Sequence, residues 1–145
     1  MPAAAGDHVP DIDIIDVPDI DINIEQIPGG GIPGNGEKGG VAVPGNHYLC
    51  YNVEPHEKFR PVDVELADQF MEWETTVVRP ERVCTPVRKN KSKVYDEKIH
   101  LVCYRIEKGR PANRRVEMAN QRGKQQRFTV VEPTTLCVPS YKKVL

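Results

Sequence analysis

Short segments with alternating apolar and polar residues recur from residue 48 to the C-terminus. Six of them are rich in β-branched and aromatic residues, as strands are: 48–53, 62–66, 75–78, 100–106, 116–118 and 128–131. Proline, glycine and asparagine separate these segments. No stretch keeps a helical period over three turns, although residues 65–73 could form one short helix. The pattern therefore predicts an all-β fold.

The strand segments belong to two copies of one unit, residues 47–90 and residues 100–143. The realignment is close: residues 76–80 read TVVRP, and residues 129–133 read TVVEP. A tandem repeat of about 53 residues predicts one folded body with internal symmetry. With about three strands in each copy, we expect residues 47–145 to form a small pseudo-two-fold sandwich or barrel.

Each copy carries two cysteines at the same separation, Cys50 with Cys84 and Cys103 with Cys137. Their spacing contains no Cys-x-x-Cys pair and fits no zinc knuckle or ribbon. In a small chain, four such cysteines indicate two disulfides formed in an oxidising compartment; four buried thiols in a cytosolic protein are the alternative. All three pairings respect the duplication. We expect Cys50–Cys84 and Cys103–Cys137, because a unit that was bridged before it was duplicated would keep its own bridge.

The residues around the cysteines also carry a resemblance to a known family. The segments concerned are Leu49–Tyr51, Asp68–Phe70 and Val83–Val87 in the first copy, and His100–Tyr104, Asn120–Gln121 and Leu136–Ser140 in the second. They resemble an uncharacterised family of bacterial domains, typically predicted to be secreted, with paired LCY…DQF…LCVPS units. The resemblance covers residues 47–143 and departs from the pattern at Arg122, which stands where the first copy has Phe70. It implies an extracellular, disulfide-bridged domain and implies no catalytic activity.

Residues 1–46 lie outside the duplication and have a different pattern. Isoleucine alternates with acidic residues in two short copies, residues 10–17 and 18–25, with a change of phase at Ile14-Ile15. This alternation predicts an extended strand with one apolar face and one acidic face. The apolar side chains are Ile12, Ile14, Ile20, Ile22 and Ile24, and the acidic face holds Asp11, Asp13, Asp19, Asp21 and Glu25. A linker rich in glycine and proline, residues 27–40, joins this arm to the body.

The formal net charge of −1 conceals a strong asymmetry. Residues 1–46 hold eight acidic side chains and one lysine, whereas the body holds 13 acidic and 19 basic side chains. The second copy contains a basic stretch made of Arg110, Arg114, Arg115, Arg122, Lys124 and Arg127. Phe128 is the one aromatic residue available among them, so nucleic-acid binding is not favoured. The acidic arm is the better partner for this surface, within one chain or between chains.

No catalytic constellation stands out in the sequence. It has no Gly-x-Ser-x-Gly elbow, His-Glu-x-x-His motif, phosphate-binding loop or dinucleotide fingerprint, and we expect no enzyme activity and no cofactor. His47 and His100 are repeat equivalents, which favours a structural role. Asp19 and Asp21 are weak candidates for binding calcium, because the closing glutamate and glycine of an EF-hand are missing.

Two hypotheses about function remain open. The first is a structural subunit of an extracellular filament or surface assembly, in which the arm of one subunit adds as a strand to the sheet of the next. The second is a monomeric, non-enzymatic binding module for a cell-surface glycan or protein, with candidate aromatic residues Tyr48, Tyr51, Trp73, Tyr95 and Tyr104. No signal peptide is visible, so secretion implies that one has been removed. No apolar run is long enough to span a bilayer.

Overall fold

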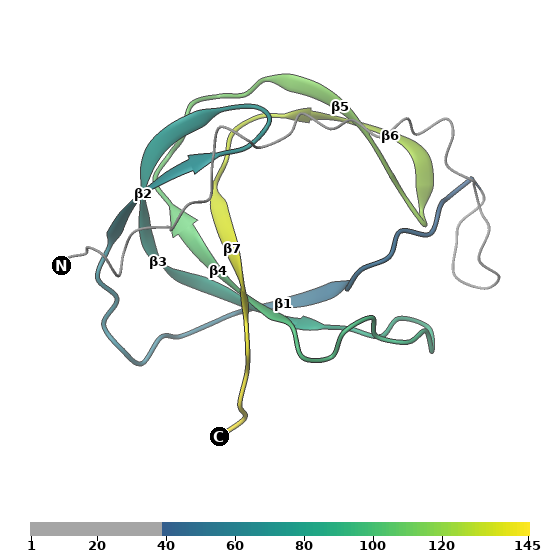
Figure 1. Ribbon diagram of the computed structural model, residues 1–145, viewed down its shortest axis with the longest axis horizontal. Helices are drawn as coiled ribbons and strands as arrows, with labels where there is room; N and C mark the ends of the chain where they lie inside the picture. Colours follow the sequence, from purple (N-terminus) through teal and green to yellow (C-terminus); the bar gives the residue numbers. More distant parts are fainter. Residues whose placement is uncertain (1–38) are drawn as a thin grey trace.

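The computed structural model describes residues 39–145, in which every regular element of secondary structure is a β-strand (Figure 1). The strands are β1 (Tyr48–Asn52), β2 (Val62–Ala67), β3 (Glu72–Pro86), β4 (His100–Ile106), β5 (Arg114–Asn120), β6 (Gly123–Val130) and β7 (Thr135–Ser140). Every pairing between them is antiparallel. No helix occurs in this part of the chain, so residues 65–73 do not form the short helix that the pattern allowed. The predicted all-β class is confirmed.

One main sheet has the strand order β1-β3-β4-β7, with β2 also paired to β3, and the β5–β6 hairpin forms a second sheet that arches away from it (Figure 1). The 15-residue strand β3 has two partners in turn on one of its edges. Residues 72–77 pair with β2, and residues 82–86 pair with β1. Pro80 lies between these two blocks, where neither strand is opposite it. A proline, which has no N–H to donate, is therefore tolerated inside this long strand.

The sequence pattern located six strands and missed part of the sheet. Each of the six predicted segments overlaps an observed strand, but β3 extends eight residues beyond Val78, and β7 was not predicted at all. Both missed pieces carry a cysteine followed two residues later by proline, at Pro86 and Pro139. Proline lowers strand propensity, and pairing with neighbouring strands overrides that local preference here.

The two copies of the repeat have the same internal pairing. Leu49 lies opposite Thr85 in the first copy, and the equivalent residues Val102 and Val138 lie opposite each other in the second. The β2–β3 pairing recurs in the same register as the β5–β6 pairing. Strand β3 thus corresponds to β6 and β7 together, which are separated by residues 131–134. The two copies therefore share the register of their strand pairs, and they differ in that the long strand of the first copy is divided into two strands in the second.

Within residues 39–145, the two copies follow one another along one sheet. Strands β1 and β4 are repeat equivalents, and so are β3 and β7, so the order β1-β3-β4-β7 is one unit followed by the next. Because β1 and β4 are both antiparallel to β3, they run in the same direction. The connection through residues 87–99 returns the chain beside β3, which adds the second unit to the edge of the first.

The buried apolar core of residues 39–145 is small. It comprises Val41, Val77, Cys84, Cys103 and Ile106. Four of these five residues lie on β3 or β4, and Val77 is directly opposite Ile106. We call the pairing of β3 with β4, residues 77–84 against 101–106, the inner seam. Most of the buried apolar surface is therefore at the joint between the two copies.

The last residues of the predicted linker contact the second copy. Val41 is 1% exposed, and its backbone N–H donates a hydrogen bond to the carbonyl of Asn120 at 2.9 Å. Gly40 lies directly against the backbone of Gln121, where a Cβ atom would overlap the carbonyl group. Glycine is needed at this point because the two backbones approach closely. Residues 40 and 41 thereby fasten the start of the described chain to the β5–β6 turn.

Candidate assembly site

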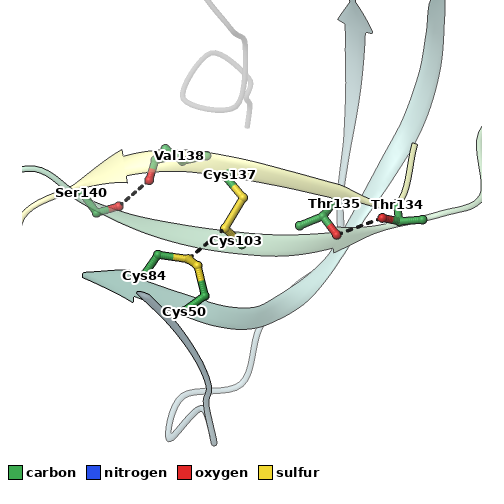
Figure 2. Close-up of a disulfide and its surroundings, with 8 residues drawn as sticks. All are labelled: Cys50, Cys84, Cys103, Thr134, Thr135, Cys137, Val138 and Ser140. Carbon is green, nitrogen blue, oxygen red and sulfur yellow. Dashed lines mark hydrogen bonds between the residues drawn. A yellow bond between two sulfur atoms is a disulfide. The ribbon is translucent and has the colours of Figure 1, made fainter. Parts of the chain in front are cut away.

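Two disulfides cross the main sheet, Cys50–Cys84 and Cys103–Cys137 (Figure 2). This is the pairing expected from the repeat, and it is confirmed. Each bridge joins residues directly opposite each other on neighbouring strands, with Cα atoms 3.9 and 4.0 Å apart. Bridges of this kind form and persist in oxidising compartments.

The four cysteines form a row across the sheet in which the inner members are protected. The Sγ atoms of Cys84 and Cys103 lie 3.7 Å apart across the inner seam (Figure 2). Cys84 is 0% exposed and Cys103 is 3% exposed, whereas their partners Cys50 and Cys137 are exposed. Each disulfide therefore has one end in the core and one end at an outer strand. The difference arises because, among residues 39–145, the inner cysteines have a neighbouring strand on both sides and the outer cysteines have one on a single side.

The outer strands β1 and β7 each pair with one strand among residues 39–145, so each leaves an edge open. On β1, the N–H of Val87 donates to the carbonyl of His47 at 2.9 Å, which fixes the alternation of hydrogen-bonded pairs along this ladder. The backbone groups of Tyr48, Cys50 and Asn52 consequently point away from β3, toward the open edge. The same alternation on β7 directs the backbone groups of residues 135, 137 and 139 outward.

Apolar side chains accompany the open edges. Leu49 and Tyr51 on β1 are 47% and 52% exposed, and Val138 on β7 is 38% exposed. In β4, the equivalents of Leu49 and Tyr51 are Val102 and Tyr104, and both are half-buried. Soluble proteins usually protect edge strands with charge, proline or a covering element. Edges with exposed leucine, tyrosine and valine are suited to receiving another strand.

The aromatic residues considered for a binding module differ in their exposure to solvent. Tyr48, Trp73 and Tyr104 are half-buried, and the Tyr104 ring contacts Phe59 with ring centroids 5.6 Å apart. Tyr51 and Tyr95 are exposed. The set therefore does not form one exposed platform.

The basic stretch is partly occupied by contacts within the domain. The guanidinium group of Arg114 lies over the Phe70 ring at 5.7 Å, and Arg127 Nε is 3.3 Å from Glu117 Oε1. Arg110 donates a hydrogen bond to the Glu72 carbonyl at 3.3 Å. Two of these contacts, those of Arg110 and Arg114, link the second copy to the first.

The predicted arm residues lie outside the described part of the chain. This applies to the apolar and acidic faces alike, and to the calcium candidates Asp19 and Asp21. Within residues 39–145, no three His, Cys, Asp or Glu side chains gather into a group that could hold a metal ion. The same residues include no helix with the length and apolar character needed to cross a membrane.

Comparisons of the chain with protein-family models, curated proteins and solved structures found no match. The resemblance to the family with paired LCY…DQF…LCVPS units therefore stays a prediction.

The sequence pattern did not identify the edge residues Leu49, Leu136 and Val138 as a site. Leu49 lies in a predicted strand, and Leu136 lies beside a repeated cysteine, but neither position is distinguished by residue type. The useful signal was the duplication itself. A repeat that adds units side by side in a sheet must leave one unmatched edge at each end.

Proposed function

We propose that this protein is a structural subunit of an extracellular filament or surface assembly, in which added strands extend the sheet of one subunit into the next. The observation that carries the proposal is the pair of open edges, on β1 and β7, with exposed apolar residues such as Leu49 and Val138. An added strand bonds to the free backbone groups of an edge and buries the apolar side chains beside them. The two disulfides, which suit an oxidising compartment, support an extracellular location.

The strand predicted for residues 10–25 is a donor in this proposal. It carries five alternating isoleucines, Ile12, Ile14, Ile20, Ile22 and Ile24. Each would contribute roughly 1.5–3 kcal/mol when fully buried, before the cost of ordering the arm is subtracted. Its acidic face complements the basic body of a neighbour. A contact in which one subunit donates and the next accepts is head-to-tail, and it produces open polymers unless a ring closes.

The test compares the unmodified full chain with the variant Ile20→Ser/Ile22→Ser/Ile24→Ser by negative-stain electron microscopy and light scattering. We expect polymers from the unmodified chain and their loss in the variant, since three apolar anchors are removed. Asn23→Ser, on the polar face of the same segment, is the matched control and should still polymerise. Far-ultraviolet circular dichroism should show the same β-signal in all three proteins.

The outcomes separate the parts of the proposal. Polymers that persist in the isoleucine variant would rule out the arm as the donor. Monomers from the unmodified chain at every accessible concentration would contradict assembly itself. That result would favour the second candidate, a binding module for a cell-surface glycan or protein, for which exposed Tyr51 and Tyr95 are the specific support. Saturable binding to glycans that is lost in Tyr95→Ala would then be expected.

A further inference from the structure

We infer that β7 of one copy pairs with β1 of the next copy and so repeats the inner seam between molecules. This inference rests on the proposed assembly function and names the joint that would build it. Strand β7 is the repeat equivalent of β3, and β1 is the equivalent of β4. The two open edges of the sheet are thus equivalent to the two edges that already meet inside the chain. This joint is an alternative to addition of the N-terminal arm at the same two edges. It predicts that polymers persist in the Ile20→Ser/Ile22→Ser/Ile24→Ser variant, whereas donation by the arm predicts their loss.

The inner seam supplies the register of the new joint. Val83 lies opposite Val102, and Cys84 lies opposite Leu101. Translated by one repeat, these pairs become Leu136 opposite Leu49 of the next copy, and Cys137 opposite Tyr48 of the next copy.

The backbone hydrogen bonds fit this register. The backbone N–H and C=O groups of Cys50 point away from β3, and those of Cys137 point away from β4. The reason is that each disulfide joins a close pair without mutual backbone hydrogen bonds. Both open edges therefore present their donors and acceptors at the positions that the inner seam uses. Pro139 lacks an outward N–H, but its equivalent Pro86 lies beyond Cys84–Leu101, where the inner seam ends. Pro139 is thus compatible with pairing between β7 and β1 of the next copy in this register.

The burial pattern fits as well. At the inner seam, Cys84 and Cys103 are 0% and 3% exposed with their sulfur atoms in contact. The exposed Cys137 and the Cys50 of the next copy would occupy the equivalent places, and the row of disulfides would continue from molecule to molecule. Residues 131–134, which interrupt the second copy, correspond to the part of β3 that β4 supports. A neighbouring β1 would supply the missing support.

An arginine on the surface has a place in the same joint. Arg110 crosses from the second copy to the first and donates to the Glu72 carbonyl at 3.3 Å. Its equivalent in the Arg-Pro motif is Arg60, which is exposed. In the proposed joint, Arg60 reaches the carbonyl of Gln125 in the preceding copy, the equivalent of Glu72. The contact between the Phe59 and Tyr104 rings is not reproduced in this joint, because Gly109 stands where the first copy has Phe59. The joint between molecules is therefore weaker than the inner seam.

Repetition of this joint produces an open filament. A head-to-tail contact built by a step along a sheet leaves the same two edges free after every addition. Neighbouring strands twist by about 20–25°, so a copy that contributes four strands to the sheet turns the next by roughly a quarter of a revolution.

The test is a cross-link between two variants of the full chain that each carry one added cysteine, Leu49→Cys and Leu136→Cys. Val83 and Val102 form a close pair without mutual backbone bonds, the arrangement in which the native cross-strand disulfides occur. An equimolar mixture under mild oxidation should therefore give a disulfide-linked heterodimer with a 49–136 bridge, identified by mass spectrometry. Val138→Cys, two residues out of register on β7, is the matched control. We expect at least ten times more heterodimer from the 49/136 mixture than from the 49/138 mixture.

Each outcome decides between the joint and the function. Equal yields, or no 49–136 bridge while the unmodified chain still forms polymers in light scattering, would overturn the joint and leave the assembly function standing. The absence of both polymers and bridge would overturn both.

Hydrogen exchange on the unmodified chain keeps the inference testable if a variant misfolds. The outward amides of Tyr48, Cys50, Thr135 and Cys137 should become at least ten times slower to exchange in the polymer than in the monomer. Unchanged exchange at these four amides in a polymer would overturn the joint.

Discussion

The inner seam and the two outer edges are built from equivalent strands, but the seam is buried and the edges are exposed to solvent. At the seam, Cys84 and Cys103 are buried and their sulfur atoms touch. At the edges, the equivalent residues Cys137 and Cys50 are exposed. Residue type does not account for this, because the repeat places cysteine at all four positions. The comparison teaches that burial in this fold is assigned by the neighbouring strand and would be acquired by the edges if another strand were added.

The same comparison holds for the continuity of the strands. In the first copy, β3 runs unbroken for 15 residues, and in the second the equivalent segment is divided between β6 and β7. Pro80 and Pro133 are repeat equivalents, so proline alone does not cause the break. The segment around Pro80 pairs with β4, whereas residues 131–134 have no equivalent partner within the described chain. A strand that contains proline stays extended where a neighbour fixes it.

The largest effect is expected when both cysteines of one disulfide are replaced and the polar replacement stands at the inner end instead of the outer end. Cys50→Ser/Cys84→Ala and Cys50→Ala/Cys84→Ser both remove the bridge and leave no free thiol at either position. Each should lose about 2–4 kcal/mol of unfolding free energy through loss of the cross-link. The second should lose a further ~1–3 kcal/mol, because it buries an unpaired hydroxyl at position 84.

Chemical denaturation of both proteins measures this difference. Equal stabilities would show that the two ends of the bridge have the same environment in solution, contrary to the burial of Cys84.

A smaller difference is expected for one apolar residue and its repeat equivalent. Val77 is 7% exposed and faces Ile106 across the inner seam, while its equivalent Val130 is only half-buried. Val77→Ala should cost about 2 kcal/mol, from the lost methyl groups and the cavity they leave. Val130→Ala should cost less than half as much in the monomer. Thermal unfolding at low protein concentration gives both values, and a larger cost for Val130→Ala would contradict the comparison.

The smallest effect is expected for the two equivalent arginines. Arg110→Ala removes a hydrogen bond between the two copies and should lower the stability of the monomer by about 0.5–1.5 kcal/mol. Arg60→Ala should leave monomer stability within about 0.5 kcal/mol. It should weaken self-association, by roughly three- to tenfold for one lost hydrogen bond. Lys58→Ala, two residues earlier and also exposed, is the control for loss of charge.

Analytical ultracentrifugation measures the self-association of these variants. Equal association of Arg60→Ala and the unmodified protein would remove Arg60 from the joint without affecting the strand pairing.

Much of the fold could be predicted because its signals are local or repeated. Alternation located six strands, and the equal spacing of the cysteines favoured the bridges Cys50–Cys84 and Cys103–Cys137 that the structure contains. Strand β7 was missed because Pro139 lowers local strand propensity. The order of the copies along the sheet could not be predicted, since a repeat in the sequence does not specify whether its copies are related by rotation or by a step along a sheet.

The sequence by itself determined the all-β class and the duplication, and it favoured the cysteine pairing that the structure contains, because these features depend on residue type and spacing along the chain. Only the tertiary structure decided the strand order, and with it which end of each disulfide is buried and which strands are left at the edges. The physical reason is that a strand satisfies its backbone hydrogen bonds through partners that are distant in the sequence. Leu49 and Val102 occupy the same place in their repeats. What separates them, among residues 39–145, is that β4 has a strand on both sides and β1 has a strand on one.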